Sequence, residues 1–407
     1  MSRRRFLLAS AGLGVGGLTT AVSRSWAADT WAPAVQPKPL SKTVKRGLGW
    51  LEKHQLEDGG WGQGEESRQM GGGQGMASRS NVADSCIATL ALLRAGSTAK
   101  SGPHAKAIQR AAGYVLGQIE KSDDKSLYVT DVRGTRVQSK IGPYIDTFLS
   151  AQLLAELKDH MPDAKANQRL TAGLNKVLAK IEANQRDDGT WDDRGWAPVL
   201  SQAVAAKGMA RAKQRGVGVK DEVLERTERN AAKSLEGGKF SGKGSAGVDL
   251  YSTAANTGAL SDSVNTNEMD EDFVQDLAKN AKDPRVKRQA QAKLQRYRKT
   301  KAKKNSAQAA LIDKLEDPRF AAGFGSNGGE EFLSYMLVSE SLVAKGGKEW
   351  KRWDTAMASS LARVQNQDGS WTGHHCITGR TFCTSAALLV LLADRAPVPL
   401  ASKVRGG

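Results

Sequence analysis

Hydrophobic and polar residues divide much of the chain into two kinds of helical segment that alternate. In residues 43–54 and 353–364 apolar side chains recur every three or four positions, and charged and polar residues occupy the opposite face. Residues 83–94 and 382–393 are apolar almost all round, as is typical of helices buried on every side. The alternation predicts an all-α protein with an inner layer of apolar helices and an outer layer of amphipathic ones.

A seven-residue motif follows three of the amphipathic segments. The pattern Gln-x-x-Asp-Gly-x-Trp occurs at residues 55–61, 185–191 and 365–371 with identical spacing. The Asp-Gly pair predicts a positive φ where the helix stops, and we expect the glutamine amide to bind the free carbonyl groups there. A tryptophan at fixed spacing usually packs in the joint between helices, and carbohydrate binding is its functional alternative.

Weaker copies of the same arrangement fill the gaps between the three motifs. Residues 108–157, 228–255 and 309–343 each contain an amphipathic segment, a turn and an apolar segment. Six helix pairs result, over residues 40–394, and residues 265–308 form a charged helical insertion. A linker at residues 28–39 precedes the pairs, and a tail at residues 395–407 follows them.

These repeats resemble the glutamine-tryptophan repeats of the squalene cyclase and protein prenyltransferase superfamily. The resemblance implies an α/α toroid with inner and outer rings of helices, whose active site lies at the mouth, where outer helices end and inner helices begin. It does not indicate one reaction. The Asp-x-Asp-Asp segment of hopene-type cyclases is missing, and aromatic residues make up only 6% of the chain, which is few for a carbocation cavity. Cyclase activity is therefore disfavoured.

The resemblance to prenyltransferases draws attention to Asp84 and Cys86, which look like the zinc-binding Asp-x-Cys motif of that family. The family's histidine, one repeat later, is missing here. A toroid would bring the last repeat next to the first, so His374, His375 and Cys383 are candidate partners. A zinc site of Asp84, Cys86, Cys383 and His374 or His375 would combine oxygen, sulfur and nitrogen ligands.

Roles without a metal are open to the same residues. Cys383 could pair with Cys86 or with Cys376 in a disulfide, or the thiols could be unpaired and buried. Asp84 and Asp146 are also good helix N-caps. As an acid–base alternative, Asp84, Asp146 and Glu331 are candidate catalytic carboxylates. Glu331 begins the fifth inner helix, after a glycine-rich loop at residues 323–329 that we expect to be flexible.

The positive charge of the chain is concentrated in one segment. The chain has 60 basic and 43 acidic residues, and the segment from Lys279 to Lys304 has twelve basic residues and one acidic residue. Pro284 suits a first helical turn, so residues 284–304 predict a solvent-exposed helix. Its functional interpretation is attachment to an anionic surface or polymer, and the alternative is a merely solvated insertion. Nucleic acid is an unlikely partner, because the only aromatic residue available for stacking is Tyr297.

The first residues resemble a twin-arginine export signal. Paired arginines at Arg3 and Arg4, with Phe6 two residues after the second, precede about 14 apolar residues rich in glycine, and small residues frame a cleavage site after Ala27. This apolar stretch is shorter than the roughly 20 residues that span a bilayer. We therefore expect residues 1–27 to be a signal peptide and the mature chain to be periplasmic or extracellular, without a transmembrane span. Two functions remain open: an enzyme at the toroid mouth, or a cell-envelope binding or scaffold module.

Overall fold

The computed structural model describes residues 31–33, 35–66, 75–235, 244–397 and 401–403, and it is all-α apart from one small pair of strands. The strands β1 (Trp31–Pro33) and β2 (Ala401–Lys403) pair in antiparallel orientation. The helices are α1 (Lys42–Lys53), α2 (Val82–Arg94), α3 (Ala105–Lys121), α4 (Arg136–Ile141), α5 (Ile145–Leu157), α6 (Ala164–Ala183), α7 (Pro198–Gln214), α8 (Asp221–Ser234), α9 (Asp249–Asn280), α10 (Pro284–Lys314), α11 (Pro318–Ala321), α12 (Gly329–Lys345), α13 (Gly347–Arg363) and α14 (Arg380–Leu391).

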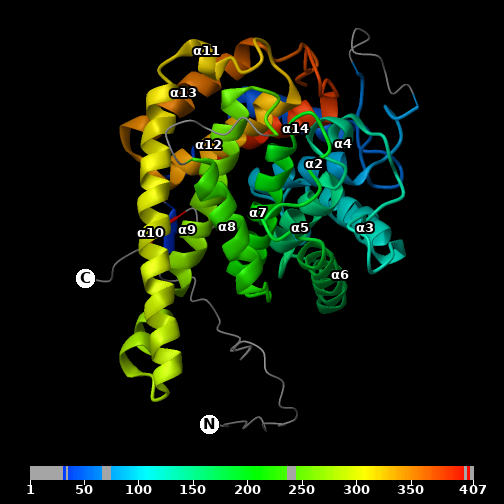
Figure 1. Cartoon of the computed structure of the whole chain (residues 1–407). Coiled ribbons are helices and arrows are strands. Elements are labelled where there is room, and N and C mark those ends of the chain that lie inside the picture. Colours follow the sequence, from blue (N-terminus) through cyan, green and yellow to red (C-terminus); the bar gives the residue numbers. More distant parts are fainter. Residues whose placement is uncertain (1–30, 34, 67–74, 236–243, 398–400, 404–407) are drawn as a thin grey trace.

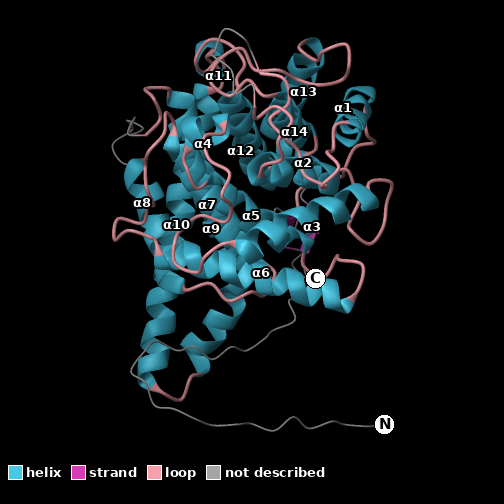
Figure 2. Cartoon of the chain, turned by 90° about the vertical axis from the view of Figure 1, so that its right-hand side faces the viewer, coloured by secondary structure: helices cyan, strands magenta, loops and turns pink. Residues whose placement is uncertain are grey.

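Six of these helices form an inner set, namely α2, α5, α7, α9, α12 and α14. Each packs against the next in this order, and α14 packs against α2, so the contacts close on themselves. The amphipathic helices α1, α3, α6, α8, α10 and α13 form an outer set, and each packs against at least one inner helix (Figure 1). Figure 2 shows α1, α2 and α14 side by side, so the first and last helices of the chain are neighbours. The predicted alternation of buried and amphipathic helices is confirmed.

The tryptophan of each motif closes its own outer helix. Trp61 Nε1 donates to Leu51 O at 2.9 Å, and Trp191 and Trp371 make the same bond to the carbonyl ten residues before them. All three indoles are completely buried. Because a carbohydrate could not reach them, the carbohydrate-binding alternative is wrong for these tryptophans.

The glutamine of each motif joins its helix to the next outer helix. Gln55 Nε2 donates to Gly59 O and to Ala107 O of α3, both at 2.8 Å. The equivalent bonds of Gln185 reach Val223 in α8, and those of Gln365 reach Thr43 in α1. The expectation that the glutamine binds free carbonyl groups at the end of its own helix is wrong. The indole N–H of the tryptophan donates to a carbonyl of that helix instead. The last motif thereby ties α13 to the beginning of the chain.

The glycine of each motif has the predicted positive φ, with values of 90° at Gly59, 86° at Gly189 and 95° at Gly369. A side chain at these positions would also collide with the neighbouring outer helix. A Cβ on Gly59 would lie 2.6 Å from Arg110 O, and one on Gly369 would lie 2.7 Å from Arg46 O. Glycine is therefore required both by the turn and by the close approach of the two helices.

The charged insertion is helical, but it is not a separate element. Residues 265–280 are the last turns of α9, and α10 begins at Pro284, in the first turn as predicted. The two helices form a long hairpin that buries Val274, Ala278, Ala290 and Tyr297 between them. The helix expected to be exposed to solvent is therefore amphipathic, with one side packed on α9.

No helix in the described part of the chain is both long and apolar enough to cross a membrane. The expected signal peptide at residues 1–27 lies outside the described residues.

Candidate functional site

Buried carboxylates gather in the first turns of three inner helices. Asp84 lies in the first turn of α2, Asp146 in that of α5, and Glu330 and Glu331 in that of α12. All four side chains are at most 2% exposed. The amide dipoles at a helix N-terminus favour negative charge, whereas burial opposes it. Where burial dominates, the carboxyl group keeps its proton at a higher pH than in water.

Two loops meet at the beginning of α12. Gly328 and His375 form an isolated β-bridge, Gly329 N donates to Ile377 O at 2.9 Å, and His374 N donates to Asn327 O at 2.6 Å. A Cβ on Gly328 would lie 2.7 Å from the His375 ring, and one on Gly329 would lie 2.6 Å from Ile377. The glycine-rich loop is thus needed for close packing, which the expectation of a flexible loop did not anticipate.

Glu331 holds these two loops together. Its Oε1 accepts hydrogen bonds from the Tyr251 hydroxyl and from Phe324 N, and its Oε2 accepts one from Gly328 N at 3.0 Å. The same Oε2 lies 3.1 Å from His375 Nε2 in an ion pair. Both oxygens of the Glu331 carboxylate are thus bound by other groups of the protein. The predicted catalytic residue Glu331 therefore holds the His375 side chain in position.

Glu330, His375 and Cys376 form a compact group with one oxygen, one nitrogen and one sulfur atom. These ligand atoms lie within 4.8 Å of one another, and in the described ranges no other group of three or more His, Cys, Asp or Glu side chains meets this spacing. Glu330 Oε1 and His375 Nδ1 are buried without a hydrogen-bond partner. Since buried polar atoms are nearly always bonded, these two atoms are candidate ligand atoms for a metal ion.

The surroundings orient the histidine of this group. His375 Nε2 lies 2.8 Å from Ser326 O, and a carbonyl oxygen can only accept, so the proton is assigned to Nε2. This assignment leaves Nδ1, which has no hydrogen-bond partner, as the acceptor atom of the ring. A histidine that binds a metal commonly donates its other N–H to a carboxylate or a carbonyl group, and His375 has both, in Glu331 and Ser326.

The group also has perturbed acidity. Burial raises the pKa of Glu330 to about 7, and the nearby charge of Glu331 acts in the same direction. Burial lowers the pKa of His375, but its interactions with Cys376 and Glu331 outweigh this effect and raise the pKa to about 10. Without a metal, the imidazolium is therefore stable at neutral pH, and a metal ion would have to displace its proton.

Zinc fits this donor set. Carboxylate oxygen, imidazole nitrogen and thiolate sulfur are all ligands that Zn²⁺ accepts. The predicted zinc site shares only His375 with the observed group. In the described residues Asp84, Cys86, His374 and Cys383 belong to no group with metal-ligand spacing, and the His374 side chain is exposed.

The two predicted catalytic aspartates are both bound by neighbouring protein groups. Asp84 Oδ2 accepts from Asn81 Nδ2 at 2.7 Å, and Asp146 accepts from Ala83 N at 3.0 Å and from Gln138 Nε2 at 2.7 Å. Burial raises the pKa of both carboxyl groups. The N-cap of α2 is Asn81, and Tyr144 occupies that position in α5. The N-cap alternative for Asp84 and Asp146 is therefore wrong, although both lie within one turn of the cap.

All three cysteines are free and buried, so the disulfide alternative is wrong. Burial raises the pKa of Cys86 far above its usual value, and Cys86 contacts Ser150 Oγ at 3.7 Å. Burial also raises the pKa of Cys383, with the charges of Glu66 and Glu330 acting in the same direction. Both thiols are therefore poor nucleophiles.

Exposed aromatic rings lie beside the group. Phe324 is 54% exposed, and its ring centroid lies 5.0 Å from that of His375. Trp196 is 44% exposed, and its ring centroid lies 6.4 Å from that of Phe324. Exposed apolar surface of this kind commonly marks a binding site. The two rings therefore place partly exposed apolar surface next to His375.

Sequence reasoning missed several residues of this region. It names Cys376 among three cysteines that could form a disulfide or bind a metal, but leaves it out of the predicted zinc site. This residue has a positive φ of 52°, rare for a side chain other than glycine. Glu66 binds Thr378, and burial raises its pKa. Tyr251 reaches Glu331 from α9. The only sequence feature that could have pointed to the site was a cysteine next to two histidines. The long-range contacts of Glu66 and Tyr251 leave no recognisable pattern in the sequence.

A buried ion network was also missed, and it lies farther along the inner helices. Glu340 of α12 accepts from Arg94 Nη1 at 2.9 Å and from Lys207 Nζ at 2.6 Å, and Lys207 also pairs with Asp262 at 2.8 Å. Its members come from five different inner helices and are almost completely buried; they are Arg94, Glu156, Lys207, Arg211, Asp262 and Glu340. The network joins the inner helices through their charged side chains.

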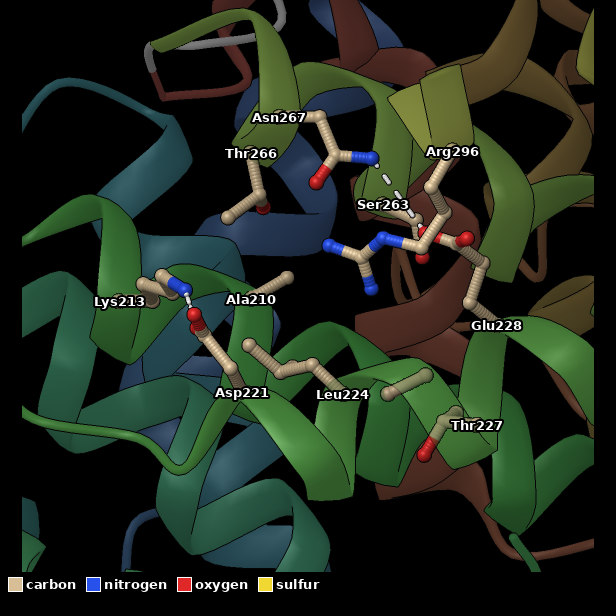
Figure 3. Close-up of a pocket in the computed structure, with 11 residues that line it drawn as sticks. Ala210, Lys213, Asp221, Leu224, Thr227, Glu228, Ser263, Thr266, Asn267 and Arg296 are labelled. Carbon is tan, nitrogen blue, oxygen red and sulfur yellow. Dashed lines mark hydrogen bonds and ion pairs between the residues drawn. The ribbon is translucent and has the colours of Figure 1, made fainter. Parts of the chain in front are cut away.

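A small pocket between α7, α8, α9 and α10 is separate from this site (Figure 3). Lys213 pairs with Asp221 at one side, and Asn267 Nδ2 donates to Glu228 at 3.3 Å on the other. Figure 3 shows the Arg296 side chain reaching into the space between them. The free volume is about 20 Å³, which is room for roughly one water molecule and too little for an organic substrate.

No protein-family model matches the chain, and none of the curated proteins matches it.

Proposed function

We propose that the chain is an exported α/α-toroid protein of the prenyltransferase and squalene cyclase repeat superfamily, with a zinc-dependent enzyme centre at the toroid mouth. The closed order of contacts among the six inner helices supports the toroid. The three motifs support the superfamily, because each repeats the same indole and glutamine bonds. The paired arginines before a short apolar stretch support export.

The observation that carries the enzyme proposal is the group of Glu330, His375 and Cys376, with two buried atoms left unpartnered. These three residues would hold the metal. Three protein ligands leave a coordination position for substrate, as in catalytic rather than structural zinc sites. Zinc bound there would act as a Lewis acid on a substrate oxygen. Glu331 and Ser326 keep the His375 ring in the orientation that directs Nδ1 to the metal.

Neighbouring carboxyl groups would move protons. Asp84 has one buried, unpartnered oxygen, Oδ1, and burial raises its pKa. A carboxyl group that keeps its proton to a higher pH than in water is able to act as a general acid. Phe324 and Trp196 would border the approach to the metal and exclude water from one side of a bound substrate.

Metal analysis of the full chain, purified without chelator, tests the proposal. We expect about one zinc ion per chain. The substitution Cys376→Ser should remove most of it, because a hydroxyl group is a poor zinc ligand. Cys86→Ser is the matched control, because Cys86 is also a buried thiol and lies outside the group. Equal zinc loss in both variants, or a wild-type chain that binds no zinc when zinc is supplied, would contradict the proposal.

A second candidate function is a non-catalytic module for cell-envelope binding, using the toroid concavity and the basic arm. The observation that favours it is the set of α10 cations that face solvent. The metal analysis separates the two candidates, because a module of this kind needs no zinc.

A further inference from the structure

The basic helix α10 has two faces that differ in how their charge is compensated. On the face toward the molecule, Lys293 pairs with Asp221 and Asp270, both at 3.0 Å. Arg296 pairs with Glu225 at 2.8 Å, and Lys301 pairs with Glu268 at 2.7 Å. These cations are neutralised by carboxylates of α8 and α9, so they contribute to folding rather than to an external partner.

The opposite face carries cations without such partners. Lys287, Arg288, Arg298 and Lys299 are exposed, and within the described residues they make no hydrogen bond or ion pair. Residues eleven apart are separated by about three helical turns, or roughly 16 Å, and lie on nearly the same line. Lys287 and Arg298 therefore form one column and Arg288 and Lys299 an adjacent one. Together they define what we call the basic face.

The basic face lies on a part of the molecule that projects. Figures 1 and 2 show the tip of the α9–α10 hairpin extending beyond the other described helices. The first residue of α10 is at this tip, and its last residue leads into α11 and the loop that contains Phe324. A helix of 31 residues is about 45 Å long, so the basic face and the proposed metal centre are at opposite ends of it.

We infer that the basic face docks on the anionic headgroups of a phospholipid bilayer. A flat surface can meet cations of both columns along the projecting segment, and none of these four side chains is neutralised by an ion pair within the described residues. The site requires no apolar insertion of a helix, in keeping with the amphipathic packing of α10.

Nucleic acid fits the hairpin less well. Binding of single strands relies on aromatic side chains that stack on bases. Tyr297, the aromatic residue of α10, is 5% exposed and donates its hydroxyl to Asp270 at 3.0 Å. The ring is therefore not available for stacking.

Co-sedimentation of the full chain with vesicles tests this inference. The vesicles contain phosphatidylglycerol with phosphatidylcholine, and vesicles of pure phosphatidylcholine are the reference. We expect binding to the anionic vesicles at low salt, little binding to the neutral ones, and loss of binding near 1 M salt, where charges are screened within about 3 Å. Absence of binding to the anionic vesicles at low salt would overturn the inference.

Two variants with the same change in net charge locate the binding surface. Replacing Lys287, Arg288, Arg298 and Lys299 by Gln should weaken binding at least ~100-fold, given the contribution of each cation near an anionic bilayer. The control replaces four exposed lysines elsewhere, at Lys42, Lys45, Lys106 and Lys165, and should retain most of the binding. The N-terminal apolar stretch is identical in both variants, so its own affinity for lipid cancels.

Three results would reject the basic face as a lipid-docking surface. Equal weakening in the two variants would show that net charge alone is responsible. Unchanged binding of the basic-face variant would place the contact elsewhere. Binding to an anionic polymer such as polyglutamate, without binding to vesicles, would assign the face to a linear polyanion. The zinc content of both variants should match the wild type, which separates failure of docking from failure of the metal centre.

Discussion

Glu330 shows how burial and hydrogen bonding determine the behaviour of one carboxyl group. It neighbours Glu331 in the first turn of α12, and both are completely buried. Glu331 accepts hydrogen bonds through both oxygens, whereas Glu330 accepts one bond, from Ile377 N at 3.3 Å, and leaves Oε1 unpartnered. Two adjacent glutamates should therefore respond in opposite ways to the same substitution.

We predict that Glu330→Gln stabilises the metal-free protein at pH 8 and has little effect at pH 4. Burial raises the pKa of Glu330 from 4.5 to about 7 in the folded state. The folded state thus keeps a proton that the unfolded state releases, so stability falls as the pH rises from 4.5 through 7. A shift of this size corresponds to about 3 kcal/mol, and glutamine removes it. Urea unfolding at the two pH values measures the difference.

The adjacent residue provides the comparison. Glu331→Gln should destabilise the protein, because the amide cannot accept at both positions from Tyr251, Phe324, Gly328 and His375. If Glu330→Gln lowered stability at pH 8, as is expected of Glu331→Gln, burial would not be the cause of a raised pKa at Glu330.

At the scale of single residues, sequence reasoning predicted some members of the site and missed how they combine. It identified Glu331 and His375 and placed Glu331 at the start of a helix, which is confirmed. It could not find the pairing of Glu330, His375 and Cys376. That pairing depends on a positive φ at Cys376 and on the bridge between Gly328 and His375, and neither leaves a periodic pattern in the sequence.

At the scale of elements, the joint after each motif is the unit that repeats. The glycine turns the chain, the indole closes the helix, and the glutamine binds the next outer helix. Arg110, Arg226 and Arg46 return a hydrogen bond to the three glutamine side chains. Each arginine stands three residues after the carbonyl that its glutamine binds. The acceptor residues are of three different types, so this regularity is evident only in the structure.

We predict that Gly59→Ala destabilises the protein by more than about 2 kcal/mol. The φ of 90° is unfavourable for alanine, and the new Cβ would lie 2.6 Å from Arg110 O, a backbone atom that cannot move aside cheaply. Thermal unfolding followed by circular dichroism measures the loss.

Gly113→Ala is the matched control. Gly113 lies within α3, and a Cβ there would meet no atom within 4 Å. Alanine should stabilise that helix by roughly 0.5–1 kcal/mol. If Gly59→Ala were tolerated as well as Gly113→Ala, the turn at Gly59 would not pack as closely against Arg110 as the structure shows.

At the scale of the whole molecule, the periodicity of the sequence predicted six pairs of helices, and their all-α character is confirmed. The constant spacing of the motif predicted the helix ends correctly, because the turn and the indole bond of each joint involve residues that are close in sequence. The α9–α10 hairpin was predicted as a separate insertion because charged residues dominate its composition. Small residues such as Ala278 and Ala290 are nevertheless buried where its two helices pack together. The buried ion network was invisible, because charged residues in apolar segments are isolated in sequence and meet only when the helices pack.

That network gives the last prediction, which concerns how the inner helices are held together. Glu340 binds Arg94 and Lys207 and lies 3.6 Å from Arg211. Burial raises the pKa of Glu340, but Lys207, Arg94 and Arg211 outweigh it and hold the pKa well below its usual range. Removing one partner of a buried pair leaves uncompensated charge, so Glu340→Gln should cost about 3–5 kcal/mol at pH 7.

The pH dependence distinguishes this effect from a loss of packing. A carboxyl group with a lowered pKa contributes stability above pH 4.5, its unfolded value, and the contribution is lost as the pH falls toward the folded pKa. The penalty of Glu340→Gln in urea unfolding should therefore shrink below pH 4.5. Glu316→Gln is the control, since Glu316 pairs with Arg352 at an exposed position and surface pairs contribute little. A penalty that stayed constant from pH 7 down to pH 3 would mean that shape, and not charge, links the inner helices here.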